Sequence, residues 1–579
     1  MKNLFPLCIL FFTIFFSSIV GGQEFRTVFE NSQGKQSATY FECIRFYQEL
    51  ASKFTTLKMI TGDTTDSGYP LNVVLYSNDK TFNPAKMHAA NKIVILVNND
   101  IHPGEPDGLD ASMMLLRDLA TGKIKSADNV VFAVIPAYNI GGALNRSAFS
   151  RVNQNGPELY GFRGNAENLD LNRDFIKADS RNAFAFEKIY QWLQPDVFLD
   201  NHVSDGADYQ YTMTLLTSQH NKLGGPLGIF LHDIFEPALY VGMQKKNWPM
   251  TPYVNFEDGN ADKGWAAFYD SPRYSSGYTT LFQTISFMAE THMLKPYIDR
   301  VHSTYALMQT LMEQSSIHAR EIISKRKENI ENIISQDSFA LGWRPDTTHF
   351  EMIHFKGYEA LTKTSDVTGM PRMYYDHSKP FEKEVRFYNT FVPVNTVKKP
   401  FAYIIPHGWY QVIDRLKLNG VQMTMLAHDT DIHVEWYRVE DYKSYPKPFE
   451  KHHINYSVKL STHQDLLHFL KGDYLIYTNQ PANRYMVETL EPKGDDSYFL
   501  WNFFDAILQE KEGYSNYRWE DVAAEYLATH PDLKQKFDEK RKNDLDFAKS
   551  ADAQLNYIYK NSPYYEPAHL RYPVYRLLQ

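Results

Sequence analysis

Two side chains that can bind a metal ion stand three residues apart in NNDIHPGEPDG, directly after the apolar run KIVILVNN. They are His102 and Glu105, and Pro103 and Gly104 between them favour a tight turn over a helix. Zinc prefers nitrogen and oxygen ligands at about 2 Å and keeps one position open in a catalytic site. The pair can therefore supply two of three protein ligands, although its spacing alone is a weak pattern.

A third ligand and a catalytic carboxylate are available at two further apolar segments. PDVFLDNHVSDG places His202 at the end of a predicted strand, where it is either a metal ligand or a core histidine satisfied by a backbone partner. SFMAETHML ends another apolar strand with Glu290. Because a carboxylate in such a place is costly without a partner or a task, Glu290 is a candidate for catalysis.

The elements that must position these residues alternate in type between residues 70 and 330, which predicts an α/β domain. Several of the strands are apolar enough to be buried on both faces, so we expect helices on both sides of the sheet. His102 and His202 fall at strand ends, where open α/β sheets assemble ligand sites. Strands are predicted at 70–77, 92–99, 129–137, 196–203 and 280–290, and helices at Leu109 to Thr121, Ser180 to Leu193 and Lys295 to about Ser335.

The chain of 579 residues is long enough for several domains. Residues 1–22 read as a secretory signal, with an uncleaved membrane anchor as the alternative. We place the α/β domain at 23–335. Alternating patterns at 391–407, 415–426, 431–442 and 472–479 predict a β-rich domain at 336–480, and helical periodicity at 501–513 and 522–540 predicts a helical segment at 481–579.

Composition limits the cellular compartment and the binding partners that we expect for this protein. Cys8 lies in the signal, so Cys43 is alone in the mature chain and no intramolecular disulfide is expected. A formal net charge of −9 argues against nucleic acid as a partner. No second stretch can span a bilayer, so we expect an exported periplasmic or extracellular protein without stable membrane insertion after signal cleavage. Composition does not indicate an oligomeric state.

A further segment, NLDLNRDF, completes a pattern that resembles a known family. On its own it could be a capping asparagine, Asn172, followed by a surface arginine, Arg173. In chain order, however, the HxxE pair, Asp-x-Asn-Arg, a strand-end histidine and a late glutamate resemble the zinc metallocarboxypeptidases of the M14 type. The resemblance covers about residues 40–320 and is strongest to exported bacterial members. It implies a mixed eight-stranded sheet with helices on both faces.

The resemblance also implies the metal site and the catalytic base. His102, Glu105 and His202 would hold one zinc ion per chain and leave a position for water, and Glu290 would act as general base and then general acid. Asp170 resembles the acid that fixes the ring of the first zinc histidine.

The same likeness implies residues that contact the substrate. Arg163 would stabilise the oxyanion, with Arg151 as the alternative, and Arg173 with Asn172 would grip a terminal carboxylate. A tyrosine near the base would contact substrate, and of Tyr269, Tyr274 and Tyr278 in FYDSPRYSSGYTT we prefer Tyr278.

We therefore predict a zinc-dependent carboxypeptidase, whose partner is a peptide with a free C-terminal carboxylate. The alternative is a zinc deacylase or amidohydrolase that acts on N-acyl amino acids or cell-wall peptides. A binding protein that has lost catalysis is a third reading, which the intact set of ligands, arginine and base disfavours.

Overall fold

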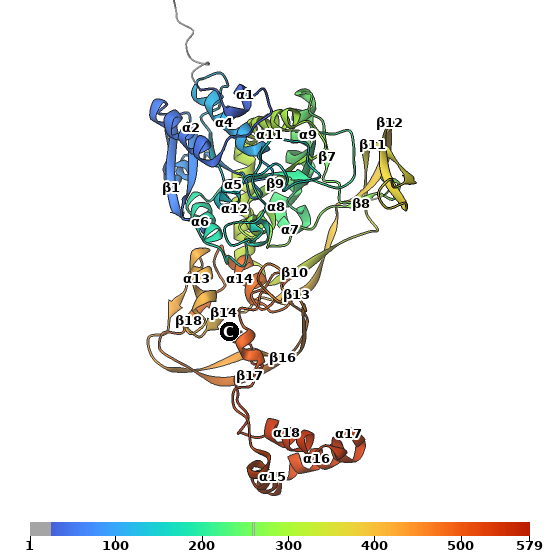
Figure 1. The fold of residues 1–579 in the computed structure, drawn as a ribbon. Coiled ribbons are helices and arrows are strands. Elements are labelled where there is room, and N and C mark those ends of the chain that lie inside the picture. The colour runs from blue at the N-terminus through green and yellow to red at the C-terminus, as the bar shows by residue number, and fades with distance from the viewer. Residues whose placement is uncertain (1–24, 257–258, 260, 579) are drawn as a thin grey trace, which may run out of the picture.

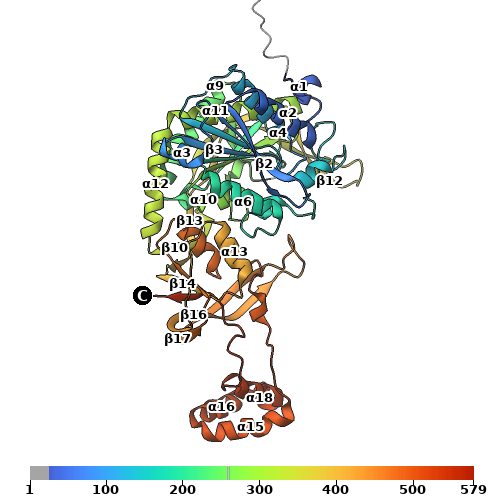
Figure 2. The ribbon, with the colours of Figure 1, turned by 90° about the vertical axis from the view of Figure 1, so that its left-hand side faces the viewer.

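The computed structural model describes residues 25–256, 259 and 261–578. The predicted signal, residues 1–22, lies outside the described residues. An α/β unit, a β-rich unit and a group of four helices follow one another, and the helices extend away from the rest (Figures 1 and 2). No helix in the described ranges is long and apolar enough to cross a bilayer.

The α/β unit is built on an eight-stranded mixed sheet in the order β1-β2-β4-β3-β5-β9-β6-β7. The central strands β4, β3, β5 and β9 run parallel to one another, whereas β1, β2 and β6 are antiparallel to a neighbour. The strands are β1 (Leu57–Thr64), β2 (Pro70–Ser77), β3 (Ile93–Asn98), β4 (Val130–Ile135), β5 (Val197–Ser204), β6 (Met213–Thr217), β7 (Met250–Pro252) and β9 (Ile285–His292).

Helices cover both faces of this sheet because its central strands are apolar on both sides. Every residue of β3 and β4 is buried, as their unbroken apolar runs predict. One face packs on α2 (Tyr40–Lys53), α4 (Asp107–Ala120), α8 (Gly225–Phe230), α9 (Glu236–Lys245) and α11 (Tyr297–Ile317). The other packs on α6 (Arg181–Leu193) and α10 (Ser275–Thr280), and then on the β-rich unit. The predicted fold class is confirmed.

Smaller elements complete this unit. The helix predicted from Lys295 to about Ser335 is two helices, because α11 ends at Ile317 and α12 (Ala319–Ser335) begins after His318. The short elements are α1 (Val28–Asn31), α3 (Pro84–Ala89), α5 (Ile140–Leu144), η1 (Leu171–Arg173), α7 (His220–Leu223), η2 (Leu231–Phe235), η3 (Ala261–Lys263) and β8 (Trp265–Ala266).

The β-rich unit contains a six-stranded sheet and two hairpin-like pairs. The sheet has the order β15-β18-β14-β19-β16-β17. Its strands are β14 (Ala402–Ile405), β15 (Thr424–Met425), β16 (Thr430–Ser444), β17 (Asn455–Phe469), β18 (Tyr474–Tyr477) and β19 (Tyr575–Leu577). The pairs are β10 (Ser338–Pro345) with β13 (Phe391–Lys398), and β11 (Glu351–Thr364) with β12 (Pro371–Tyr388), which also joins β8 of the α/β unit.

Three expectations for this half of the chain are wrong in detail. Residues 415–426 were expected to be extended, but α13 (Tyr410–Leu418) occupies their start because Val412, Ile413 and Leu416 share a buried helical face. Residues 501–513 form turns and η4 (Asp505–Leu508) instead of an α-helix. The final segment is not wholly helical, since β19 returns to pair with β14. The remaining helix, α14 (Asn483–Leu490), is fully buried.

The four terminal helices form a small core of their own. They are α15 (Asn516–Thr529), α16 (Pro531–Asn543), α17 (Leu545–Lys549) and α18 (Ala551–Lys560). Trp519, Phe537 and Phe547 pack together in a cluster that contains only residues 514–565. The two connecting segments meet where the N–H of Lys511 donates to Glu566 at 2.6 Å. The group is therefore an insertion whose two ends lie close together.

We predict that residues 514–562 can be replaced by a short Gly/Ser linker without unfolding the rest. The main thermal transition should move by less than about 2 °C, since a change of about 1 kcal/mol moves Tm by about 2–4 °C in a unit of this size. Calorimetry of the full chain and of the shortened chain measures it. Trp519→Ala in the full chain is the control and should melt the helical group alone. A fall of the main transition by 10 °C in the shortened chain would contradict the prediction.

Candidate metal and catalytic site

The first two candidate ligands lie on the loop between β3 and α4. The N–H of Glu105 donates to the carbonyl of His102 at 2.7 Å, so the loop turns back on itself. Gly108, in the first turn of α4, is needed for close packing, because a Cβ there would lie 2.5 Å from the Cβ of Asn201. This approach brings the loop against β5, the strand that carries His202.

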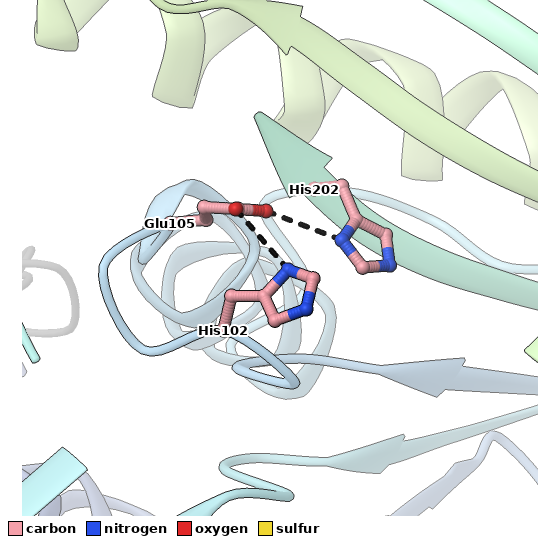
Figure 3. Close-up of side chains that lie close together, drawn as sticks. All are labelled: His102, Glu105 and His202. Carbon is pink, nitrogen blue, oxygen red and sulfur yellow. Dashed lines mark hydrogen bonds and ion pairs between the residues drawn. The ribbon is translucent and has the colours of Figure 1, made fainter. Parts of the chain in front are cut away.

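Glu105 lies between two histidine rings (Figure 3). Its Oε1 is 3.1 Å from His102 Nδ1, and its Oε2 is 3.2 Å from His202 Nδ1. All three side chains are buried, and one ligand atom from each lies within 4.8 Å of the others. Within the described ranges, no other group of three His, Cys, Asp or Glu side chains comes together as this one does.

The donor set fits a zinc ion. Two ligands at about 2 Å from a tetrahedral ion lie about 3.3 Å apart, close to the two separations from Glu105. Two imidazoles and one carboxylate are also a donor set of catalytic zinc sites. His102, Glu105 and His202 could therefore hold such an ion with little rearrangement.

A carboxylate also lies at the outer nitrogen of each histidine. His102 Nε2 is 2.9 Å from Asp170 Oδ1, and His202 Nε2 is 3.2 Å from Asp200 Oδ2. A proton held on Nε2 leaves Nδ1 free as a metal donor, so the hydrogen bond of His102 to Asp170 favours the tautomer that a metal needs. Asp200 lies near His202 Nε2 without hydrogen-bond geometry. Burial opposes a charge on His202, but Asp200 and Glu105 outweigh it and raise its pKa well above the usual range.

Asp200 is a site residue that the sequence analysis missed. A signal was present in FLDNHV, because alternate residues of a strand point to one face and Asp200 stands two positions before His202. Its other oxygen accepts a hydrogen bond from the Asn98 side chain at 3.3 Å, at the end of β3. Two neighbouring parallel strands therefore fix this carboxylate.

Both arginines that the sequence offered reach the site. Arg151 Nη1 is 2.9 Å from Glu105 Oε1, and Arg163 Nη1 is 3.8 Å from the same oxygen. Arg163 also pairs with Asp170 at 2.8 Å. The Arg163 side chain is 45% exposed and that of Arg151 only 19%. Burial alone would raise the pKa of Glu105, but the charges of Arg151 and His102 hold it well below its usual range.

Glu290 lies on β9 beside the metal cluster. It pairs with His202 of β5 on one side and with Thr214 of β6 on the other. Burial raises its pKa to about 8; the charge of His202 opposes this shift, and that of Glu105 adds to it. A nearby dication would favour the ionised form, so this carboxyl is suited to exchange a proton near neutral pH.

The Asn172 and Arg173 pair is joined to the cluster through Asp170. The N–H of Asn172 donates to Asp170 Oδ1 at 2.9 Å, and its side-chain oxygen accepts from the N–H of Ser275 at 3.2 Å. The Arg173 guanidinium lies 4.6 Å from the centre of the Tyr274 ring and is 23% exposed. The segment therefore brings a partly exposed arginine next to the metal cluster.

Tyr278 does not lie at the site, which corrects the weak preference for it. The side chain is fully buried among Phe175, Phe186 and Tyr190, and its hydroxyl donates to Asn419 at 2.7 Å. The tyrosine lies in the core because the whole of helix α10 is buried. It therefore has no free hydroxyl for a substrate.

A cavity of about 690 Å³ lies beyond the edge strand β7. Thr251 and Tyr253 line it from the sheet, and Ile353 and Phe387 line it from the β11–β12 hairpin. Burial raises the pKa of Tyr253, and the charge of Glu290 adds to the shift.

Comparisons with known proteins agree with this picture. No family model matches the chain. Carboxypeptidase 2 of Trichophyton rubrum is 22% identical over 450 residues, which cover 74% of this chain and 77% of the relative. Carboxypeptidase 2 of Trichophyton tonsurans is 21% identical over 432 residues, which cover 71% and 74%. Among solved structures, carboxypeptidase A of Helicoverpa armigera gives a TM-score of 0.38 at 14% identity. The match covers 49% of this chain and 75% of the Helicoverpa chain.

These relatives bear on two of the expectations. The two Trichophyton proteins are fungal, so they do not establish the expected likeness to exported bacterial proteins. They support the expectation that the chain is an enzyme of the peptidase class of hydrolases. The chain is thus similar to named carboxypeptidases along about three quarters of its length.

Proposed function

We propose that this chain is a zinc-dependent metallocarboxypeptidase that hydrolyses the C-terminal peptide bond of peptides. One observation carries the proposal: a buried His102, Glu105 and His202 cluster with Glu290 on the adjacent strand. These are the groups that hydrolysis by a metal-activated water requires. Export through the amino-terminal signal is part of the same proposal.

Each residue has a task that its contacts support. His102, Glu105 and His202 hold one zinc ion, which when bound polarises a carbonyl and lowers the pKa of water. The Glu290 carboxylate accepts a proton from the attacking water and returns it to the leaving nitrogen. Arg163, the more exposed of the two arginines, stabilises the negative charge that develops on the carbonyl oxygen, while Arg151 holds Glu105.

The preference for a chain end comes from the Asn172 and Arg173 pair. A guanidinium binds a carboxylate through two parallel hydrogen bonds, which gives both strength and direction. The Arg173 guanidinium lies over the Tyr274 ring, and its Nη1 donates to the Asn172 carbonyl at 2.9 Å, so the remaining donors of this partly exposed side chain can meet such a group. A peptide with a free C-terminal carboxylate is therefore the proposed substrate.

We predict that hydrolysis needs both the metal and Glu290. Metal-depleted protein should be inactive, and added zinc should restore the wild type but not Glu290→Gln, because glutamine cannot accept the proton. The loss in kcat should be about 10²- to 10⁴-fold. Elemental analysis should find one zinc per chain in both proteins. The role given to Glu290 is wrong if the folded, zinc-loaded variant hydrolyses peptides at the wild-type rate.

We predict that the enzyme distinguishes free from amidated peptide ends. Arg173→Met should lower kcat/KM for free-acid peptides about 10- to 100-fold, the equivalent of a charge-assisted hydrogen bond. Amidated peptides should be poor substrates for both proteins. Arg181→Met, at an exposed position at the start of α6, is the control and should change nothing. Faster hydrolysis of N-acyl amino acids than of any peptide would favour the deacylase alternative instead.

The metal-free protein should lose stability as pH rises, because of Glu290. Between pH 4.5 and about 8 the carboxyl is ionised in the unfolded chain but protonated in the folded one, so the free energy of unfolding falls as pH rises through this range. Glu290→Gln removes this loss. In a chelator, the variant should melt above the wild type at pH 8 and together with it at pH 4. An equal Tm difference at both pH values would show that ionisation of Glu290 is not the cause.

A further inference from the structure

A turn of the β-rich unit, residues 449–452, meets the segment of the α/β unit that carries Asp170. The N–H of Phe449 donates to His452 at 2.8 Å, and the N–H of His452 donates back at 3.0 Å. Glu450 and Lys451 between them have φ values of 46° and 78°. Non-glycine residues enter this region only at a cost, so the surrounding contacts must hold the turn in its shape.

Three consecutive residues of the turn contact the segment 167–179. Glu450 Oε2 accepts a hydrogen bond from the Asp170 N–H at 2.8 Å. Lys451 Nζ is 4.0 Å from a carboxylate oxygen of Glu167, and His452 Nε2 is 2.6 Å from a carboxylate oxygen of Asp179. The Glu450 contact differs from the other two because it reaches a residue that touches a candidate metal ligand.

The turn is backed by packed side chains from both units. The His452 ring lies 5.5 Å from the ring of Trp501, and the Arg273 guanidinium lies 4.9 Å from the same ring and 5.9 Å from that of Phe449. Arg273 is held in turn by Asp496, which it contacts at 2.7 Å. The turn is therefore braced from behind, and Glu450 is presented to the α/β unit at a fixed place.

We propose that Glu450 is a positioning residue of the metal site, supplied by the β-rich unit. It holds the backbone of Asp170, whose carboxylate contacts His102 Nε2 and Arg163. Loss of this hydrogen bond would leave the Asp170 amide without its acceptor and free the segment to shift. The imidazole that Asp170 orients would then offer Nδ1 to the metal less well.

This inference rests on the proposed zinc site and gives the β-rich unit a task within it. The α/β unit supplies all three ligands, but the alignment of one of them depends on a residue 280 positions from Asp170 in the chain. The site is then complete only when the two units are docked.

Zinc affinity, measured by competition with a chromogenic chelator, tests the proposal. Glu450→Ala should weaken zinc binding about 10-fold, at the low end of the range for residues that orient metal ligands. It should lower kcat more than it raises KM. Glu450→Gln should stay near the wild type, because its amide oxygen still accepts the hydrogen bond. Lys451→Ala, in the same turn but without contact to Asp170, is the matched control and should change neither quantity.

Two further variants make the outcome decisive. Glu450→Asp keeps the charge, but its side chain is one methylene too short to reach the Asp170 N–H, so it should behave like Glu450→Ala. If alanine prevents folding, Glu450→Asp takes the place of that variant. Asp170→Ala should weaken zinc binding more than any change at Glu450. Zinc binding within twofold of the wild type in Glu450→Ala and Glu450→Asp, with a loss in Asp170→Ala, overturns the role of Glu450 alone. No loss in Asp170→Ala overturns the proposed second contact of His102 as well.

Discussion

Each histidine of the candidate metal site is held between two carboxylates, and the chemistry of the site depends on this arrangement. Glu105 faces Nδ1 of both rings, while Asp170 and Asp200 face the two Nε2 atoms. Contacts on both sides limit the rotation of each ring, and the hydrogen bond between His102 Nε2 and Asp170 leaves His102 Nδ1 directed at the site. A buried imidazole without such partners would be free to rotate, and its inner nitrogen would face the ion only part of the time.

The same arrangement concentrates negative charge, which the protein balances unevenly. The charges of Arg151 and His102 keep the pKa of Glu105 low, whereas burial raises the pKa of Glu290 to about 8 against the opposing charge of His202. Two carboxyl groups in one site thus acquire different tasks from their surroundings. Glu105 stays ionised and suited to bind a cation, and Glu290 is suited to exchange a proton.

The fold brings these groups together at one edge of the sheet. The carboxyl ends of β3, β5 and β9 are neighbours, and His102, His202 and Glu290 lie on or just after them. The β-rich unit then closes against the segment that carries Asp170 and Arg173 through the 449–452 turn, and Asp496 accepts a hydrogen bond from the N–H of Arg273 in the α/β unit. The β-rich unit therefore covers one face of the sheet and also supports the candidate site.

The sequence by itself indicated five strands of the sheet, the cover of helices on both faces and the residues able to bind metal, but not β1, β6 or β7. It could do so because apolar runs and strand ends are local features, and because His102 and Glu105 are neighbours in the chain. It misplaced Tyr278 and read residues 415–426 as extended, since both depend on which side of a short helix meets the core. Only the tertiary structure decided that Asp200 faces His202, that both arginines meet at Glu105 and that Glu450 reaches Asp170. These contacts depend on the direction in which each side chain points and on how distant segments dock. A local sequence pattern specifies neither of these.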